Sequence, residues 1–557
     1  MPGANDFCRV YSSPNVGRAF SDSYLAGEPA ARAFFAPGFR DPAERQARAR
    51  IAASRKVAPA LLEVLREQQA ALPASTARQE NLDALARGQV AVVATGQQVG
   101  LFLGPLYTFY KAASAIAVAR AVQAESGIRC VPLFWLQTED HDFDEIRSCT
   151  VAGPDGKPAA LELAAETQEE SRVSMAHRRL GPEIESVLAQ LNSLLDGQPG
   201  GAEVLAILRA QYRPGQPLAA AFAGVLATLF ADEGLIFLDP RDPRVASLAA
   251  PIFRTCIEDA ELIEQQLKDR QVALLTSGFS VQVPIRANCP LVFFHQGSAR
   301  GPRFRLQKMR GPGPTQWGLA GSTEIIDQVE LLNLLTRDPL RFSTSALLRP
   351  IVQDALLPTV AYVGGPGEIN YFAELGPLYQ HFDVAPPLLV PRARFRCLDA
   401  RTRRWLQQSG LGASDLSRPA QEIGSRLARP AGFPDPQELR DRIAGQILPA
   451  VEAIASAISA TGEHLQRPAQ RTRDSVAHAL ELLMGRYTRG LVERDEATRR
   501  RLEQLQNVLN PGGVAQERVY GWPWLAGKLG VAQLKGLVMQ RLEQSGSFVT
   551  EVLEILP

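Results

Sequence analysis

The apolar and polar positions between residues 89 and 146 follow the order of a strand, a loop, a helix and a second strand. Apolar runs cover residues 89–94 and 130–136, and residues 105–123 between them have the composition of an amphipathic helix. Polar side chains stand directly after each apolar run. In an open parallel sheet, ligands bind at the carboxyl ends of the strands. The pattern therefore predicts an α/β fold whose chemistry lies at the ends of these strands.

The same patterns divide the rest of the first 400 residues into a helical segment and a core. Residues 1–88 are rich in helix formers, and we expect them to pack on a core that extends over 89–400. Two segments of the core, 151–230 and 271–345, carry short alternating signals and are predicted to be insertions. The remaining predicted elements are buried strands at 235–239 and 388–390, short strands at 280–283 and 291–294, helices at 218–229 and 243–270, and a turn at 361–368 followed by a helix.

Between residues 435 and 509 the apolar positions change to alternating steps of three and four, beginning with Ile443 and Ile447. Arginine and glutamate fill the faces between them, which is the pattern of an antiparallel helical hairpin or coiled coil. We therefore predict a helical coiled-coil domain over 401–513. A C-terminal tail, 514–557, is expected to return to the core.

Composition narrows the class of protein further. The 557 residues exceed the length of one domain, and 60 basic against 59 acidic residues give no electrostatic case for nucleic acid as a partner. The six cysteines show no paired spacing, which is typical of a reducing cytosol rather than of a disulfide framework or a zinc site. We expect neither a signal peptide nor a membrane span, because the sequence has no apolar run of about 18 residues.

Glycines and amides follow the first predicted strand. The residues concerned are Thr95, Gly96, Gln97, Gln98 and Gly104. The N-terminus of the helix at 105–123 would direct its N–H groups at this loop, which suits a phosphate or a carboxylate. The glycine spacing matches neither the dinucleotide nor the P-loop fingerprint, so the alternative is a turn that only packs helix on sheet. Two adjacent glutamines are poor core residues, and they favour ligand binding.

An acidic cluster follows the second predicted strand. Its members are Glu139, Asp140, His141 and Asp142. Three acids around one histidine could hold a divalent metal, bind an ammonium group or transfer a proton, and such close like charges raise at least one carboxyl pKa. The alternatives are a helix N-terminus, where acids favour the helix dipole, and a structural histidine.

A third glycine-rich turn contains Gly364, Gly365 and Glu368, with Tyr371 after it. Successive glycines let the backbone approach a ligand, although a purely structural turn fits the pattern equally well.

Three further side chains are candidates for the same site. Tyr107 and Lys111 are one turn apart on the first predicted helix, so both could face its loop. Lys111 is a candidate phosphate contact, or else an ordinary solvated lysine. Arg392 supplies positive charge near a strand end, although a single arginine in such an arginine-rich chain is often a surface residue.

Four segments carry a resemblance to a known family: TGQQVGLFLGPLYTFYKA, VPLFWLQTEDHDFDEI, LRPIVQDALLPTVAYVGGPGEINYF and NPGGVAQERVY. The chain resembles the bacillithiol biosynthesis cysteine-adding enzymes, the BshC family, over essentially its whole length. The resemblance implies a Rossmann-like core, a coiled coil used for homodimerisation, a cytoplasmic location and a nucleotide. It also implies a ligase that joins the carboxyl group of cysteine to the amine of glucosaminyl-malate, the last step of bacillithiol synthesis.

The mechanism is a hypothesis built on that reaction. Amide formation from a free carboxylate is uphill in water, so we expect ATP to activate the carboxyl as an acyl-adenylate or an acyl-phosphate. The first and third loops would bind nucleotide or substrate. His141 or a neighbouring acid would act as general base, and the acids would bind the ammonium of cysteine or a Mg²⁺ ion, without a dedicated metal cage. The alternatives are a related ligase with another amine acceptor and a non-catalytic nucleotide-binding scaffold.

Overall fold

The computed structural model describes residues 17–555 except 154–155, 169, 312, 419–422, 424–431, 462–465 and 494–495. The first sixteen residues, where we expect no signal peptide, lie outside this part. The chain divides into two compact units. The first comprises the described residues up to Val151, together with Ala160–Phe395 and Tyr520–Leu553. The second comprises the described residues of Ala152–Ala159 and Arg396–Val519, with 554–555.

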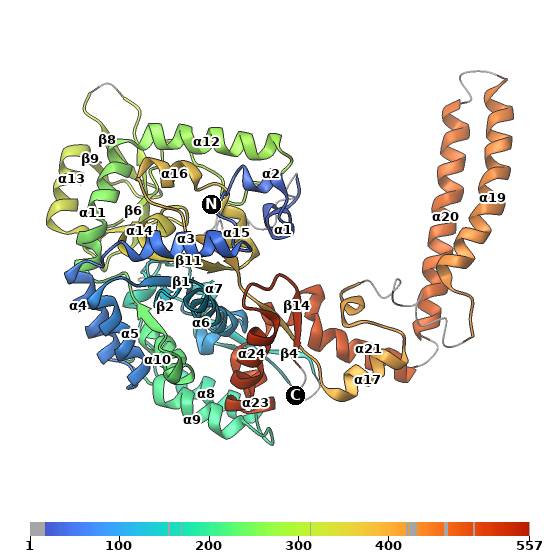
Figure 1. Cartoon of the computed structure of the whole chain (residues 1–557). Coiled ribbons are helices and arrows are strands. Elements are labelled where there is room, and N and C mark those ends of the chain that lie inside the picture. The colour runs from blue at the N-terminus through green and yellow to red at the C-terminus, as the bar shows by residue number, and fades with distance from the viewer. Residues whose placement is uncertain are drawn as a thin grey trace. The chain divides into compact units, whose positions relative to one another are not determined.

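A parallel five-stranded sheet forms the centre of the first unit (Figure 1), in the order β12-β11-β1-β2-β5. Its strands are β1 (Ala91–Gln97), β2 (Cys130–Leu136), β5 (Ile236–Leu238), β11 (Thr359–Gly364) and β12 (Leu388–Pro391). All but one of their residues are buried, as near-continuous apolar runs in a parallel sheet require. The predicted α/β class is confirmed, and so are the predicted strands at 130–136, 235–239 and 388–390, with shifts of a residue or two.

The order of the strands creates a topological switch point beside β1. From β1 the chain runs through α6 (Tyr107–Ser126) to β2 and later to β5, whereas β11 lies on the other side of β1. Loops that leave β1 and β11 in opposite directions open a crevice at the carboxyl ends of the strands, where α/β proteins bind ligands. The fold therefore places the loops after β1, β2 and β11 side by side at one edge of the sheet.

Helices of the N-terminal segment cover the sheet. They are α1 (Phe20–Ala26), α2 (Pro29–Arg32), α3 (Pro42–Ala53), α4 (Pro59–Ala70) and α5 (Thr76–Arg87). α3 packs on β1 and β11, and α4 packs on β5. Asp41 begins α3 by accepting a hydrogen bond from the Ala43 N–H (2.9 Å), while Gly88 ends α5 with a φ of 82° that suits glycine. The predicted helix-rich composition of this segment is confirmed from residue 20 onward.

The second insertion forms an antiparallel sheet in the order β10-β6-β7-β8-β9. Its strands are β6 (Val292–His295), β7 (Arg303–Lys308), β8 (Gln316–Leu319), β9 (Ile325–Asp327) and β10 (Phe342–Thr344). The strand predicted at 291–294 is confirmed as β6. The strand predicted at 280–283 is wrong, because this segment instead donates its backbone N–H groups to the buried carboxylate of Glu374.

Two predicted boundaries in the core also change. The helix at 243–270 is two helices, α11 (Pro243–Glu258) and α12 (Ala260–Thr276). The turn predicted at 361–368 starts too early, because β11 keeps its pairing with β12 as far as Gly364. The turn is therefore confined to Gly365, and α15 (Pro366–Phe372) follows directly.

The remaining helices complete the first unit. They are α7 (Phe143–Ile146), α8 (Ile184–Leu194), α9 (Gly201–Gln211), α10 (Leu218–Leu229), α13 (Gln328–Arg337), α14 (Leu348–Leu356), α16 (Gly376–His381), α23 (Trp522–Leu529) and α24 (Val531–Ser545). The helix predicted at 218–229 is confirmed as α10. From the C-terminal part of the chain, α24 packs on α6.

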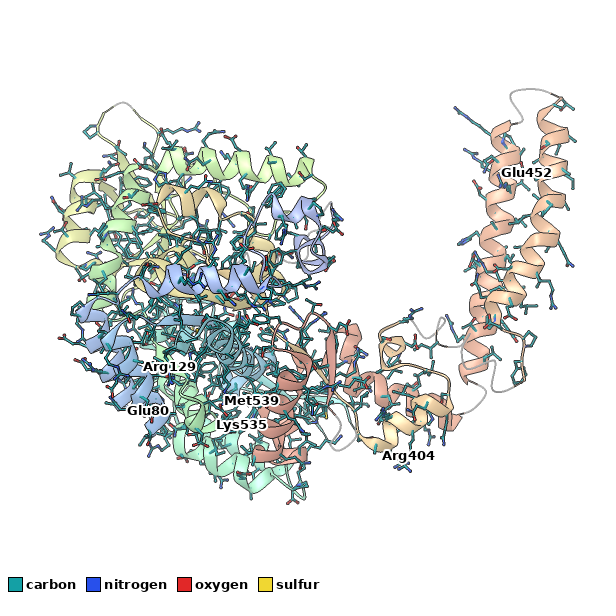
Figure 2. The ribbon with its side chains drawn as sticks, in the orientation of Figure 1. Glu80, Arg129, Arg404, Glu452, Lys535 and Met539 are labelled. Atoms are coloured by element: carbon teal, nitrogen blue, oxygen red, sulfur yellow. The ribbon has the colours of Figure 1, made fainter. Side chains whose placement is uncertain are left out.

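The second unit is helical. Its longer helices are α17 (Ala400–Gln408), α19 (Pro436–Ser459), α20 (Gln466–Glu493) and α21 (Glu496–Leu509). α19 and α20 pack against each other as an antiparallel hairpin, on which Figure 2 labels Glu452. Glu452 forms an ion pair with Arg473 (3.0 Å). The predicted helical periodicity is thereby confirmed, while the coiled coil stays a prediction.

Candidate functional site

Direct side-chain contacts join the three predicted loops at the carboxyl edge of the central sheet. Gln98, after β1, donates from Nε2 to Asp140 Oδ2 (2.8 Å), after β2. Lys111 of α6 bridges the loops after β1 and β11, since Nζ donates to Gly96 O (2.7 Å) and lies 2.5 Å from Glu368 Oε2. Lys111 and Glu368, which are 257 positions apart in sequence, therefore belong to one polar site, because parallel neighbours end at the same edge.

Lys111 is a buried cation in this site, not a solvated lysine. The residue is 2% exposed, and Nζ also donates to Gln97 Oε1 (3.0 Å). Burial lowers the pKa of Lys111, and the adjacent carboxylate of Glu368 opposes that effect. The ammonium is already matched by a carboxylate, which argues against the predicted use of Lys111 as a phosphate contact.

Both carboxylate oxygens of Glu368 have polar partners. Tyr362 donates its hydroxyl hydrogen to Oε1, and the Gly365 N–H donates to Oε2 (2.8 Å). Burial would raise the pKa of Glu368, but Lys111 and these hydrogen bonds together hold it below its ordinary value. Arg349 lies behind them and donates to the hydroxyls of Tyr362 (3.2 Å) and Tyr371 (3.1 Å). Glu368 and Tyr371 are thus brought to the site, as part of a buried network.

Several glycines and Thr95 serve the packing of the site. Thr95 is fully buried and donates its hydroxyl hydrogen to Val363 O (2.8 Å), so it links β1 to β11 and does not face outward. A Cβ atom on Gly96 would approach Trp135 O to 3.0 Å, and one on Gly364 would approach Glu368 Cβ to 3.2 Å. Glycine is needed at both positions because other segments of the same chain pass close by.

The N-terminus of α6 differs from its predicted role. The Leu106 N–H donates to Tyr520 O (2.7 Å), and the Thr108 N–H donates to Pro105 O (2.9 Å). The helix begins at Tyr107 rather than at 105, and Gly104 is buried against Cys149. Two amides of the expected anion site are therefore already bonded within the protein, which argues against an anion site there.

Tyr107 and Arg392 form an aromatic and cationic pair near the turn after β11. The guanidinium of Arg392 lies 5.1 Å from the centroid of the Tyr107 ring, and the Arg392 N–H donates to Gly364 O (2.8 Å). Gln97 donates to the hydroxyl of Tyr107 (3.4 Å). The backbone of Gly365 lies beside the Arg392 guanidinium, so both residues belong to the edge predicted to bind ligand.

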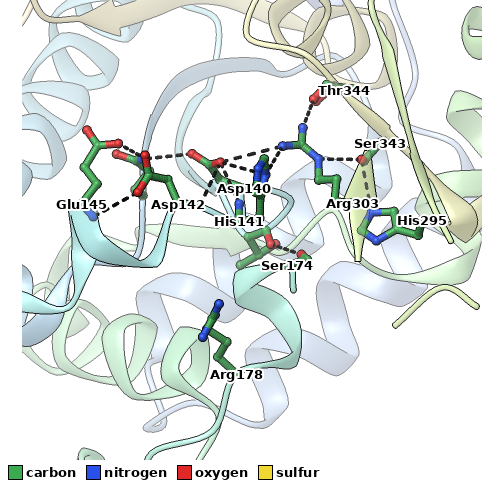
Figure 3. A network of polar contacts seen from close by, with 12 residues as sticks. Asp140, His141, Asp142, Glu145, Ser174, Arg178, His295, Arg303, Ser343 and Thr344 are labelled. Carbon is green, nitrogen blue, oxygen red and sulfur yellow. Dashed lines mark hydrogen bonds and ion pairs between the residues drawn. The ribbon is translucent and has the colours of Figure 1, made fainter. Parts of the chain in front are cut away.

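Asp140 is the central carboxylate of the acidic cluster (Figure 3). Oδ1 accepts from the His141 N–H (2.7 Å), and Oδ2 accepts from Gln98. Burial would raise the pKa of Asp140, but Arg303, His141 and Gln98 together hold it below its ordinary value. An ionised carboxylate with a partly exposed side chain (30%) suits the binding of an ammonium group.

His141 faces Arg303 instead of an open site. Arg303 donates from Nη1 to His141 Nδ1 (3.0 Å), which places the ring hydrogen of neutral His141 on Nε2. Burial and the charge of Arg303 lower the pKa of His141 to about 4. The lone pair that a general base needs is already used, and the ring is a weak base at neutral pH. The geometry argues against the predicted role of His141 in proton transfer.

The other acids of the cluster hold their protons more tightly. Asp142 begins α7 by accepting from the Glu145 N–H (3.3 Å), as a helix N-terminus requires. Glu145 accepts from Gln98 through Oε2 (2.7 Å). Burial and the charge of Asp140 raise the pKa of both Asp142 and Glu145. Glu139 turns the other way and accepts from the hydroxyl and N–H of Thr344 in β10, and burial raises its pKa.

Three residues of the site carry little or no signal of their role in the sequence. Glu145 belongs to the acidic run but carries no distinguishing signal there. Tyr362 lies inside an apolar strand, where a tyrosine is expected to be part of the core. Arg303 comes from the second insertion, and only the three-dimensional pairing of β7 beside β6 brings it to His141.

Two further findings concern metal ligands and membrane spans. Within the described ranges, no group of three or more His, Cys, Asp or Glu side chains is arranged to hold a metal ion. None of the helices in this same part of the chain is both long and apolar enough to cross a membrane.

A parallel sheet with a polar switch-point edge defines a Rossmann-like α/β protein, and comparison with known proteins gives its family. Residues 9–393 match the family described as "Bacillithiol biosynthesis BshC, N-terminal Rossmann-like domain". The chain belongs to the BshC family, as its sequence motifs predict.

Relatives from three bacteria carry the name "Putative cysteine ligase BshC". The protein of Koribacter versatilis is 31% identical, and the aligned region covers 86% of each chain. That of Salinibacter ruber is 28% identical over 96% of this chain and 97% of its own. That of Solibacter usitatus is 30% identical over 92% and 93%. The predicted enzyme class, a ligase, is confirmed by these relatives.

Proposed function

We propose that this protein joins the carboxyl group of L-cysteine to the amine of glucosaminyl-malate, with ATP as the energy source, in the last step of bacillithiol synthesis. The observation that carries the proposal is the pairing of carboxylates at the switch-point edge. Ionised Asp140 lies beside Glu145, whose pKa is raised, and the single amide of Gln98 contacts both. Two carboxyl groups whose pKa values are shifted in opposite directions are suited to bind an ammonium group and to accept its proton.

The proposed reaction has two steps. The carboxylate of cysteine attacks ATP and becomes either an adenylate, with release of pyrophosphate, or an acyl phosphate, with release of ADP. The acceptor ammonium loses a proton, its nitrogen attacks the activated carbonyl carbon, and AMP or phosphate leaves as the C–N bond forms. The adduct loses the second proton of the nitrogen, so both protons pass to a base and then to water.

Each group of residues has a place in this proposal. Asp140 binds the ammonium group of the acceptor, and Glu145, with Asp142 beside it, accepts the proton that this group loses. Partly exposed Gln97, Gln98 and Tyr107 line the edge where ATP would bind. Any Mg²⁺ would enter with the phosphates of ATP, since that ion needs few protein ligands.

An assay with all three substrates tests the function. ATP, cysteine and glucosaminyl-malate are mixed with the protein, and the products are identified by mass spectrometry, with each substrate omitted in turn. We expect the amide product only in the complete mixture. Product with a different amine acceptor alone would instead support a related ligase, and no nucleotide turnover with any acceptor would support a scaffold.

A pH profile tests the role of Glu145. A protonated carboxyl cannot accept a proton, so kcat/KM should fall as the pH drops through the raised pKa of Glu145. Glu145→Gln should lower kcat/KM by about 100-fold and remove this acid limb. The matched control is Asp144→Asn, since Asp144 is 67% exposed and pairs with Arg147 instead. If both variants keep the limb and the rate, Glu145 is not the base.

We also propose a cytoplasmic homodimer. Cys130, Cys149, Cys256 and Cys289 are free thiols, as in a reducing compartment. In the hairpin of α19 and α20, Ile454 is 62% exposed and Leu483 is 57% exposed. Ile447 and Ile458 are also exposed, and they lie seven residues before Ile454 and four after it, on one face of α19. Exposed apolar residues on one helical face are typical of a contact with a second helix pair.

Two charges on the hairpin, one on each helix, should separate the dimer. The variant Ile454→Glu with Leu483→Glu places carboxylates in the proposed contact, and we expect its mass by light scattering to fall from two chains to one. His478→Glu, at an exposed polar position of α20, is the control and should leave the dimer intact. Equal masses for the wild type and both variants would contradict a dimer through the hairpin.

A further inference from the structure

Arginines gather around Phe293 at the border of the acidic cluster. Arg303 and Arg305 are two residues apart on β7, so their side chains share one face of the sheet. Phe293 of β6 pairs directly with Arg305, and its ring centroid lies 3.9 Å from the Arg303 guanidinium and 5.9 Å from that of Arg305. The ring of His141 lies 6.4 Å from the same phenylalanine. The arginines therefore adjoin the site of proposed chemistry.

A third arginine joins this group from the first insertion. The Arg303 N–H donates to Arg172 O (2.9 Å), which fixes the backbone of Arg172 beside β7. The guanidinium of Arg172 lies 5.0 Å from the ring centroid of Phe304. Phe304 lies between Arg303 and Arg305 in sequence, so its side chain points to the other face of β7. The positive charge of Arg172 lowers the pKa of both Arg305 and His141, in each case behind the larger effect of burial. Arg172, Arg303 and Arg305 thus share one electrostatic environment.

The positive charge of this group is not balanced within the described part of the chain. There, neither Arg172 nor Arg305 has a carboxylate within ion-pair distance. Arg303 is engaged by Ser343 (3.0 Å), Thr344 O (2.6 Å) and His141, with Asp140 at 3.8 Å. Adjacent guanidinium groups repel one another, and an anion bound between them relieves the repulsion. Two half-buried arginines without acids are therefore suited to bind carboxylates.

We propose that Arg172 and Arg305, with Arg303 behind them, form the subsite that binds the two carboxylates of the amine acceptor. This inference rests on the proposed function. The acceptor carries both an amine and a dicarboxylate, and the structure offers carboxylates at Asp140 and Glu145, the cation of Arg303 beside Asp140 (3.8 Å), and further cations at Arg172 and Arg305. Arginine holds a carboxylate through two parallel N–H donors, so two arginines distinguish a dicarboxylate from a monocarboxylate. The acceptor would be oriented from its acidic end.

Kinetics of Arg172→Gln, Arg305→Gln and the double variant test the subsite. Loss of one charged hydrogen-bond donor should raise the KM for glucosaminyl-malate by about 10-fold, and the double variant should raise it further. The KM for cysteine should stay unchanged and kcat should change by less than about 3-fold. Arg209→Gln on α9, an exposed arginine on another element, is the control. Unchanged KM for the acceptor, or an equal rise for cysteine, would overturn the subsite.

A binding measurement separates this inference from the proposed function. L-malate is titrated by calorimetry into the wild type and the double variant, with L-lactate as the monocarboxylate comparison. We expect the wild type to bind malate more tightly than lactate and the double variant to lose that preference. If the protein makes the amide but the arginine variants match the wild type, the subsite is wrong and the function stands. If malate binding needs both arginines but no amide forms, the subsite stands and the function is wrong.

Discussion

Replacing Lys111 with methionine is expected to lower the free energy of unfolding by about 3–5 kcal/mol, the cost of breaking a buried ion pair by removing one partner. The substitution leaves Glu368 as a buried carboxylate that has lost its closest cation (2.5 Å), and it also removes the hydrogen bond to Gly96 O. Urea denaturation, followed by circular dichroism, measures the change. Because Lys111 joins the loops after β1 and β11, its loss should loosen both.

The double variant Lys111→Met with Glu368→Gln is the control for charge. It removes both members of the pair, so the isolated carboxylate no longer exists and part of the stability should return. A single Lys111→Met variant within about 1 kcal/mol of the wild type would contradict the ion pair. It would favour the alternative interpretation of Lys111 as a phosphate contact.

Replacing Asp140 with asparagine is expected to lower kcat/KM for amide formation by about 10- to 100-fold. The variant loses the ionised carboxylate proposed to bind the ammonium, and charged hydrogen bonds of this kind contribute about 1.5–3 kcal/mol each. His141→Gln should remain within about 10-fold of the wild type, because a glutamine oxygen can still accept the hydrogen bond from Arg303. Steady-state kinetics with the product measured by mass spectrometry compare the two variants.

The opposite ranking would contradict this assignment. If His141→Gln lost 100-fold or more while Asp140→Asn remained active, His141 would be the general base after all. Its contact with Arg303 (3.0 Å) would then have to open during turnover. Thermal denaturation of both variants, compared with the wild type, shows whether either loss of rate reflects a loss of fold.

The sequence predicts the parts of this site that local pattern controls. The run from Cys130 to Leu136 has the composition of a buried strand, and polar residues directly after a parallel strand lie at its ligand-binding edge. Gln98 and Asp140 are therefore expected at one site, and their side chains are in contact. Motifs in the same segments predict the BshC family, and the match of residues 9–393 to that family confirms the prediction.

What the sequence could not predict depends on tertiary contacts. The sequence around Lys111 is the same whether its ammonium faces water or Glu368, which is 257 positions away. The pairing of β1 with β11 brings the two residues together. Arg303 reaches His141 because β7 pairs with β6 beside the acidic loop, a register that no local pattern specifies. The role we propose for His141 differs from the predicted one for this reason, since a histidine among acids looks like a base until an arginine is seen to donate a hydrogen bond to its lone pair.

We propose that the protein activates the carboxyl group of cysteine with ATP and passes it to an amine. Cysteine labelled with ¹⁸O in both carboxyl oxygens tests this proposal most directly, with each product examined by mass spectrometry. We predict that the amide keeps one ¹⁸O and that the other appears in AMP, for an adenylate, or in inorganic phosphate, for an acyl phosphate. Amide formed without ATP, or with the second ¹⁸O found only in water, would contradict activation of the carboxyl group by ATP.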